Sequence, residues 1–468
     1  MILSILNSKH RFFWMIFHLI LGVVCTFSKW FLIVWFFLLI GLSMNKIISC
    51  FFNKNINDIF LPLVIYLSSL EVFGRMVKAY PMIPWELSKY LLLFSCLFLI
   101  LIQRIKRPYL PAMVMTLLLI PGSLVDTSNR VGADELISNL LGPMSMCIFM
   151  ICFASTNISS RMFNNILRLI WLTTIPVLFF SIVKTPDFGD ITFELGALIE
   201  TSGNFGSNQV ASILGLGMFL SYYAWMNRLL FSANHTFDGI FIGLFAYQGL
   251  LTFSRGGIVI SLISMLVYFI LFRSSRHFTA YKIRNSLRPL LFFGFAILVF
   301  AGSYAVIENR SKGNLTLRYI GESVGTLSGN KNKTLNTFTS GRYEILKSDL
   351  KLWSNNIIFG AGAGASKYLR SGINYGISTH TELSRLLAEH GIFGLIFMLV
   401  LFKSSISSFK KNDMTIYRNI LITLFLIGIG TSLHSGMRTF ITPILMAIVH
   451  FNIYEEDGFA IDAIKKKF

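Results

Sequence analysis

The chain has 468 residues, of which 54% are hydrophobic, 15% aromatic and only 13% charged. A soluble domain normally carries about 25% charged residues, so this composition excludes an ordinary soluble globular protein. The formal net charge of +19 does not indicate nucleic acid as a partner, because basic residues in short loops set the orientation of membrane proteins. The five cysteines all lie in apolar stretches, which supports neither a disulfide framework nor a zinc site.

Apolar runs of about 15 to 23 residues follow one another along the chain and predict an all-α, polytopic integral membrane protein. The expected spans lie near residues 12–28, 30–45, 59–74, 87–103, 109–125, 140–155, 166–184, 207–226, 237–252, 256–272, 288–306, 391–409, 419–436 and 439–454. Because the first two runs are short, the sequence predicts about 12–14 transmembrane helices.

The distribution of basic residues predicts the orientation of these spans. With the N-terminus in the cytoplasm, most Lys and Arg residues of the short loops fall on the cytoplasmic side. An even number of spans then returns the C-terminus to the cytoplasm. We expect three parts: transmembrane helices over 1–306, a mostly helical external loop domain over 307–390, and the last helices with a short cytoplasmic tail over 391–468. A second external segment, residues 184–208, is short and acidic.

The stretch "LLTFSRGGIVISLI", residues 250–263, contains the one charged residue between Gly239 and Phe272, Arg255. One continuous helix over these residues would be about 51 Å long, which exceeds a hydrocarbon core of roughly 30 Å. We therefore expect two spans joined by a tight turn at "SRGG", with the glycines forming the turn or allowing a close approach to the backbone. The orientation places Arg255 at the external mouth of this pair, lining a polar path. An arginine that snorkels to the interface is the alternative.

Two further segments lie in or next to the expected loop domain. Residues 339–366 predict a helix from Arg342 to Trp353, followed by a turn containing Gly360, Gly362 and Gly364. Backbone N–H groups at such alternating glycines can converge on an anion, although an ordinary loop is the alternative.

Residues 378–402 predict a short helix on the outer membrane surface, with a capping box of Thr379 and Glu382. Gly391 and Gly394 mark its join to the next span. His380 falls on the first turn, where the helix N-terminus favours the neutral imidazole that a general base requires. A surface histidine at a helix cap is the alternative.

Together these three segments resemble the O-antigen ligase and polymerase family of bacterial membrane glycosyltransferases. The resemblance rests on the "SRG" turn at Ser254–Gly256, on the arginine helix and glycine-rich turn over 342–364, and on a pattern that begins at His380 and ends at Gly394. It covers roughly residues 200–410. One departure is Thr381, where the family often has asparagine. The segment "GRMVKAYPMIPWELSKY", residues 74–90, also looks like an external loop of some members.

The resemblance implies an enzyme of the bacterial inner membrane that transfers a glycan on the periplasmic face. Its substrates would be a glycan linked to undecaprenyl pyrophosphate and an acceptor glycan or lipid A-core, with no cofactor and no metal. Arg255 and Arg342 would bind the leaving pyrophosphate, and His380 would take the proton of the acceptor hydroxyl. The further substrate-binding candidates are Arg75, Arg385, Gly360, Gly362 and Gly364. For Arg385, pairing with neighbours such as Glu389 is the alternative to a contribution to pyrophosphate binding.

Three functions remain open at this stage. An O-antigen polymerase, which fourteen spans favour, would join repeat units; a ligase would pass the finished chain to lipid A-core. The third is a flippase or other transporter, against which the absence of matching halves in the sequence argues. A protein oligosaccharyltransferase of the same superfamily would be expected to carry a larger C-terminal domain. Expected partners are the lipid bilayer and, for a polymerase, a chain-length regulator.

Overall fold

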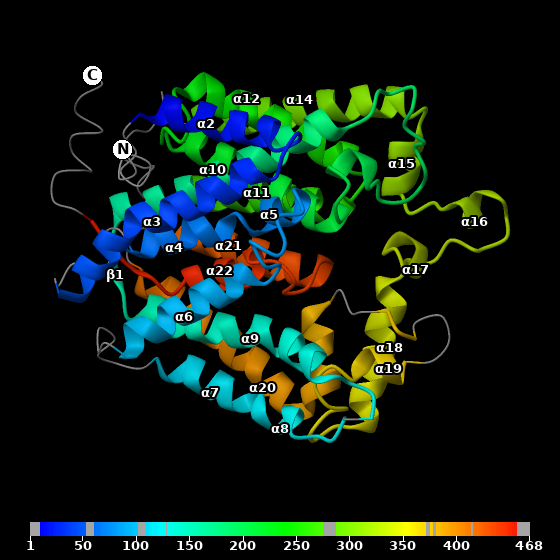
Figure 1. Ribbon diagram of the computed structural model, residues 1–468. Coiled ribbons are helices and arrows are strands. Elements are labelled where there is room, and N and C mark those ends of the chain that lie inside the picture. The colour runs from blue at the N-terminus through cyan, green and yellow to red at the C-terminus, as the bar shows by residue number, and fades with distance from the viewer. Residues whose placement is uncertain are drawn as a thin grey trace.

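A computed structural model of the chain describes residues 10–52, 60–101, 109–127, 129–274, 287–370, 375–377, 381–412 and 415–455. Within these ranges the protein is mostly helical (Figure 1). The longer helices are α2 (Arg11–Val24), α3 (Trp30–Phe52), α4 (Phe60–Ser69), α6 (Leu87–Leu101), α9 (Ala133–Ala154), α10 (Ser160–Lys184), α11 (Ser207–Met226), α12 (His235–Leu251), α13 (Arg255–Ser274), α14 (Leu287–Arg310), α18 (Arg342–Asn355), α20 (Glu382–Lys411) and α21 (Thr415–His434).

Short elements connect or extend these helices. They are α5 (Glu71–Met76), α7 (Leu110–Leu118), α8 (Ile120–Ser123), η1 (Glu200–Ser202), α15 (Asn314–Tyr319), α16 (Val324–Leu327), α17 (Leu335–Phe338), α19 (Ser366–Leu369), α22 (Ile441–Ile448) and the strands β1 (Asn157–Ser159) and β2 (Asn452–Tyr454). The two strands pair in parallel at one end of the helical bundle, which we call the strand end. Helices α15 to α19 lie at the opposite end, which we call the domain end (Figure 1).

Six helices in the described residues are long and apolar enough to cross a membrane, and they confirm the prediction of a polytopic, all-α membrane protein. These are Ala133–Ala154, Ser160–Lys184, Arg255–Ser274, Pro289–Arg310, Glu382–Lys411 and Ile416–His434. Shorter apolar helices accompany them over Arg11–Val24, Trp30–Leu42, Lys89–Phe98 and Leu110–Ser123. Every span predicted before residue 437 overlaps at least one helix.

The last predicted span, 439–454, is wrong in its extent. The helix there covers only Ile441–Ile448, and the chain then turns and forms β2 against β1. The Asn452 side chain donates a hydrogen bond to the Ala154 carbonyl at 2.9 Å, so this polar residue fixes the end of the segment to the α9–α10 connection. The apolar residues around Asn452 concealed the strand, because a short apolar run does not separate strand from helix.

The centre of the bundle is formed by α10 and α11, in which nearly all side chains are buried. Helix α10 packs against α2, α4 and α11, while α11 packs against α12 and α13. A helix that is apolar and buried on all sides belongs to the core of a bundle. In contrast, only 11% of the apolar window of α14 is buried inside the protein. We therefore place α14 at the lipid-facing periphery.

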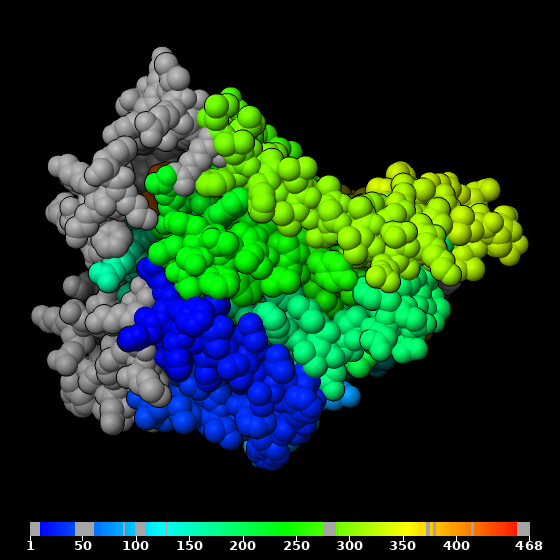
Figure 2. All heavy atoms as spheres, turned by 90° about the horizontal axis from the view of Figure 1, so that it is seen from above, coloured from blue at the N-terminus to red at the C-terminus, as the bar shows by residue number. Residues whose placement is uncertain are grey.

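The domain end has a small apolar core of its own. Phe253, Ile258, Ile307 and Leu315 are buried together with Ile191 and other residues of the α10–α11 connection. Asn314 donates a hydrogen bond from its side chain to the Phe193 carbonyl at 2.9 Å, which joins α15 to the same connection. Figure 2 shows the yellow-green segment that begins at the end of α14 projecting beyond the bundle. The core holds the base of this projection against the α12–α13 junction.

Helix α20 contains a break at Gly391, where φ is 59° and ψ is −133°. This confirms the predicted join between a short helix and a membrane span. Leu386 and Ala388 of the short helix are buried within the protein together with polar residues on its other side, and its position at the membrane surface stays a prediction. The helix begins at Glu382, whose carboxylate accepts a hydrogen bond from the Met437 N–H at 3.2 Å, and the predicted capping box with Thr379 stays a prediction. Thr379 lies outside the described residues.

The apolar stripe of α18 faces outwards. Tyr343, Leu346 and Leu350 recur at helical spacing, and each is more than a third exposed. The buried side of the helix carries Ile345 and Asp349 instead. Exposed Ile358 and Phe359 follow the helix, and Phe359 stacks on Phe393 of α20. An apolar stripe therefore marks the outer side of α18, and a buried carboxylate marks its inner side.

The Gly391 break gives a prediction about stability. A Cβ atom at Gly391 would lie 2.4 Å from the Ile358 carbonyl oxygen, and the residue has a positive φ. We expect Gly391→Ala to destabilise the protein by at least about 2 kcal/mol, since both strain and a backbone clash oppose it. Thermal unfolding of the full chain in detergent measures this. Gly302→Ala on α14, where nothing lies within 4 Å of the added methyl group, is the control and should leave the melting temperature unchanged or slightly higher.

Candidate functional site

Arg255 is the first residue of α13 and points into the base of the loop domain. Its Nη2 donates a hydrogen bond to Ser340 Oγ at 2.7 Å, and its Nη1 lies 3.5 Å from the Tyr319 carbonyl oxygen. The guanidinium carbon lies 5.5 Å from the centroid of the Phe338 ring. The predicted division of residues 239–272 into two helices is thus confirmed, and Arg255 lies where the membrane bundle meets the loop domain.

Two more arginines approach the same place. Arg318, at the end of α15, donates from Nη1 to the Leu195 carbonyl at 2.9 Å and has Nε 3.5 Å from the Phe253 carbonyl oxygen. Arg342 begins α18 as predicted, and its Nη1 donates to the Thr339 carbonyl at 3.1 Å. The Nε atom of Arg342 is buried and has no hydrogen-bond partner among the described residues. Since a guanidinium carries five N–H donors, donors remain on all three side chains.

The three arginines form a concentrated positive charge, which we call the arginine cluster (Arg255, Arg318 and Arg342). Burial, followed by the charges of Arg255 and Arg342, lowers the pKa of Arg318 from 12.5 to about 10. Burial and the charge of Arg255 likewise lower the pKa of Arg342. Among the described residues no carboxylate forms an ion pair with any of the three. Like charges held together in this way favour binding of an anion.

The residues around Arg255 explain the "SRGG" sequence in a way that differs from the prediction. The turn with positive φ is at Phe253, not at the glycines, which lie inside α13. A Cβ atom at Gly256 would lie 2.1 Å from Nδ1 of His434, and one at Gly257 would lie 2.4 Å from the backbone of Ala211. The glycines are therefore required for close packing, which was the second expectation for them.

Ser254 connects this packing to two other helices. Its hydroxyl donates to Asn208 Oδ1 at 2.8 Å and lies 3.3 Å from Nε2 of His434. His434 ends α21, and Asn208 lies in the first turn of α11. The residue that precedes Arg255 is thus fixed from both sides.

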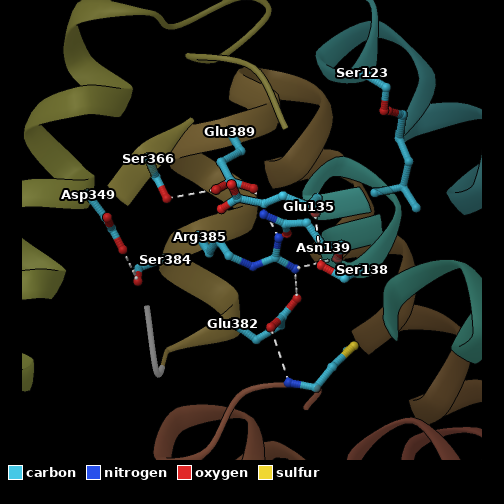
Figure 3. Close-up of polar contacts among 12 residues, drawn as sticks. Ser123, Glu135, Ser138, Asn139, Asp349, Ser366, Glu382, Ser384, Arg385 and Glu389 are labelled. Carbon is cyan, nitrogen blue, oxygen red and sulfur yellow. Dashed lines mark hydrogen bonds and ion pairs between the residues drawn. The ribbon is translucent and has the colours of Figure 1, made fainter. Parts of the chain in front are cut away.

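Arg385 lies in a separate polar network in the short N-terminal part of α20 (Figure 3). It forms ion pairs with Glu382 and with Glu389, the latter at 3.0 Å, and donates to the Asn139 carbonyl at 3.2 Å. Glu389 also accepts a hydrogen bond from Ser366 Oγ at 2.7 Å. The expected alternative of pairing with neighbours is confirmed. Two carboxylates balance the charge of Arg385, in contrast with the arginine cluster.

A buried ion pair attaches α18 to the same network. Arg370 donates to Asp349 Oδ1 from Nη2 at 2.6 Å and from Nε at 3.0 Å, and both side chains are fully buried. Ser384 of α20 donates to the other carboxylate oxygen at 2.7 Å. Burial raises the pKa of Asp349, and the Arg370 guanidinium opposes that shift. The pair sets the position of α18, and therefore of Arg342, relative to α20.

The glycine-rich turn packs on the break in α20. The Gly362 N–H donates to the Glu389 carbonyl at 3.2 Å, and the Gly360 N–H donates to the Asn356 carbonyl at 3.0 Å. A Cβ atom at Gly360 would lie 2.3 Å from the Glu389 backbone, and one at Gly362 would lie 2.4 Å from Thr127. These contacts explain why glycine stands at both positions. In this structure the N–H groups of Gly360 and Gly362 are used within the protein, and Gly364 lies at the edge of a pocket beside Asn139.

Arg75 joins four segments of the domain end. Its guanidinium pairs with Glu71, donates to the Trp85 carbonyl at 2.7 Å, and reaches Gln209 Oε1 at 3.3 Å and the Arg438 carbonyl at 3.1 Å. These contacts hold the guanidinium of Arg75 within the protein, and its predicted role in substrate binding stays a prediction. His380 lies outside the described residues; its neighbour Thr381 is buried at the start of α20.

Sequence reasoning missed two residues of this site, Arg318 and His434. Arg318 is one of several basic residues in the loop domain, and no local pattern distinguishes it from exposed ones. His434 lies at the end of an apolar run, where a histidine that packs against a glycine is not visible without the fold. Among the described residues, no group of three or more His, Cys, Asp or Glu side chains could hold a metal ion.

The fold defines a polytopic membrane protein in which three arginines approach one another at one end of the bundle. Comparison with known families adds that residues 240–399 are similar to a family whose model is described as O-antigen ligase. The match includes Arg255, Arg318, Arg342 and the N-terminal part of α20. Searches of curated proteins and of solved structures found no match.

The contact between Gly256 and His434 can be tested by a double-mutant cycle. We expect Gly256→Ala to lower the stability by about 1–3 kcal/mol, because the added methyl group overlaps the imidazole. In the background of His434→Ala the same change should cost less, giving a coupling of about 1 kcal/mol or more. Thermal unfolding of the four proteins in detergent measures the coupling. Additive effects would show that the ring and the glycine do not constrain each other.

Proposed function

We propose that the protein transfers a glycan from undecaprenyl pyrophosphate to a hydroxyl group of an acceptor sugar, and thereby extends or attaches a bacterial surface polysaccharide. The observation that carries this proposal is the arginine cluster. Arg255 and Arg342 donate to the adjacent residues Ser340 and Thr339, and Arg255 also approaches the carbonyl of Tyr319, the residue after Arg318. Among the described residues no carboxylate forms an ion pair with any of the three. A lipid pyrophosphate is the anion that such a cluster suits, because guanidinium forks bind phosphate oxygens in pairs. The family match over residues 240–399 supports the same chemistry.

The proposed reaction is a single displacement at the anomeric carbon. The acceptor oxygen forms a bond to this carbon while the bond to the pyrophosphate oxygen breaks, so the configuration inverts. The proton of the acceptor hydroxyl passes to His380, and the negative charge that develops on the pyrophosphate is stabilised by the arginine cluster. This mechanism uses the chain's own side chains as base and electrostatic stabiliser.

The site also supports an enzyme over a transporter. Transporters commonly bind their substrates near the middle of the membrane, between discontinuous helices. Here the arginine cluster and the Arg385 network both lie at the domain end of the bundle. We infer that this end faces the periplasm and that both termini lie in the cytoplasm, as the distribution of basic residues predicts.

Polymerase and ligase are two forms of this proposal. The span count favoured the polymerase, whereas the matched family is described as O-antigen ligase. Lipopolysaccharide from a strain that lacks the gene separates the two on a gel. A core carrying one repeat unit identifies a polymerase, and bare core with accumulated lipid-linked polymer identifies a ligase. An unchanged ladder contradicts the proposal in both forms.

Variants of the arginine cluster test the mechanism. Arg255→Ala and Arg342→Ala should abolish transfer at an unchanged protein level, because removal of one charge-stabilising group costs about 10²–10³ in rate. His380→Ala should also abolish transfer, because it removes the proposed base. Arg255→Lys should also be poor, since an ammonium group cannot form the bidentate contact. The length and amount of polysaccharide in a complemented deletion strain are the readout. Lys351→Gln, which removes an exposed charge from α18, is the matched control and should be normal.

The proposed role of Arg318 has its own expected result. Arg318→Gln should reduce transfer, and should also weaken binding of inorganic pyrophosphate to the purified full chain by about tenfold or more. Titration calorimetry in lipid nanodiscs gives the affinity. Equal affinity in the wild type and the variant would remove Arg318 from the anion site.

A further inference from the structure

A second polar pocket lies at the domain end, apart from the arginine cluster. It has a volume of about 200 Å³ and is bounded by the first turns of α6 and α9, the N-terminal part of α20 and the loop between α21 and α22. This is less than the roughly 300–1,000 Å³ of pockets that enclose drug-sized ligands. Its size therefore suits a single ring of a glycan better than a long chain.

The charges that line this pocket balance one another. Four acidic and four basic residues contribute to it: Glu86, Glu135, Glu382, Glu389, Lys89, Lys367, Arg385 and Arg438. Most of them are already paired. Lys89 lies 2.6 Å from Glu86, Lys367 pairs with Glu135, and Arg385 pairs with two carboxylates. The electrostatic attraction of an anion to this pocket is therefore weaker than its attraction to the arginine cluster. An uncharged ligand with many hydroxyl groups finds fixed donors and acceptors together.

One side chain in the pocket wall still lacks a partner. The side-chain oxygen of Asn139 is buried and has no hydrogen-bond partner among the described residues. A buried acceptor without a partner costs free energy unless a ligand or water supplies a donor. Ser138 lies beside Asn139 on α9, and Gly364 packs close to its amide nitrogen; all three residues line the pocket. A sugar hydroxyl in the pocket therefore meets both donors and acceptors at this wall.

The pocket adjoins the reaction site proposed above. Arg438 lines this pocket and also a neighbouring one that contains Asn208 and Ser435. Asn208 accepts the hydrogen bond from Ser254, the residue before Arg255. A glycan seated beside Asn139 can therefore extend along the same face of the protein towards the arginine cluster.

We propose that the pocket beside Asn139 and Arg385 binds an uncharged sugar ring of the acceptor glycan, while the arginine cluster binds the pyrophosphate of the donor. This inference rests on the proposed function and adds the location and chemical class of the acceptor site. The pocket, whose charges balance, would recognise hydroxyl groups through the directions of its hydrogen bonds. The arginine cluster would recognise the donor through its negative charge. The two substrates are thus distinguished by electrostatics before the reaction.

The test measures two ligands on the same protein. The first is a neutral, phosphate-free oligosaccharide prepared from the surface polysaccharide of the producing strain, and the second is inorganic pyrophosphate. Ser138→Trp places an indole at the pocket edge, and Asn139→Leu removes the amide at similar volume. We expect each variant in nanodiscs to bind the oligosaccharide at least tenfold more weakly than wild type and pyrophosphate equally well.

Ile137→Trp is the matched control, because Ile137 is exposed on the same helix and does not line the pocket. It should bind both ligands as wild type does. The proposal is overturned if the wild type does not bind the oligosaccharide, if both pocket variants bind it normally, or if the control loses it equally. Such a result leaves the proposed function standing, because pyrophosphate binding and the polysaccharide gel test that function independently. The proposed function itself fails if deletion of the gene leaves the ladder unchanged. Thermal unfolding of each variant identifies any that does not fold, and the other pocket variant then decides.

Discussion

The domain end depends on a small set of backbone contacts between the glycine-rich turn and the break in α20. The Ala361 N–H donates to the Ala388 carbonyl at 2.8 Å, and the Ile392 N–H donates to the Ile357 carbonyl at 2.7 Å. The opening of the helix at Gly391 frees the Ala388 carbonyl and the Ile392 N–H, which would bond to each other in a continuous helix. The two bonds attach the turn after α18 to α20, and the hydrogen bond from Ser384 to Asp349 attaches α18 itself to α20. The same set of contacts consequently fixes the positions of Arg342 and Arg385 relative to each other.

These contacts keep two arginine sites apart, and the two sites differ in their neighbours. Carboxylates accompany Arg385, whereas the arginine cluster has backbone carbonyls and hydroxyl groups as its neighbours. Burying like charges costs desolvation energy, which an incoming anion recovers when it binds. A site of this kind is most stable when it is occupied. In the pocket beside Arg385, by contrast, most of the charged side chains already pair within the protein.

The helices could be predicted from the sequence because a long apolar run in a membrane must satisfy its backbone hydrogen bonds internally, which a helix does. The sequence also located Arg255 at a junction of two helices and Arg342 at a helix start. It failed where tertiary contacts decide: the glycines of "SRGG" pack under His434 and Ala211, and the segment after Ile448 pairs as a strand. Each of these depends on a partner more than 40 residues away. Arg318 was missed for the same reason, since only the fold distinguishes it from other basic residues.

The parallel pair of β1 and β2 has a consequence for the order of assembly. Asn157 of β1 lies opposite Asn452 of β2. The segment between α9 and α10 therefore pairs with residues near the end of the part of the chain that the structure describes. During synthesis the helices from α10 to α21 must be in place before this contact can form, and such distant contacts form slowly because of the entropy of closing the chain. The strand pair therefore acts as a closure for the whole bundle. An incompletely inserted chain would leave the β1 edge unpaired, a feature by which the cell could distinguish it from a finished one.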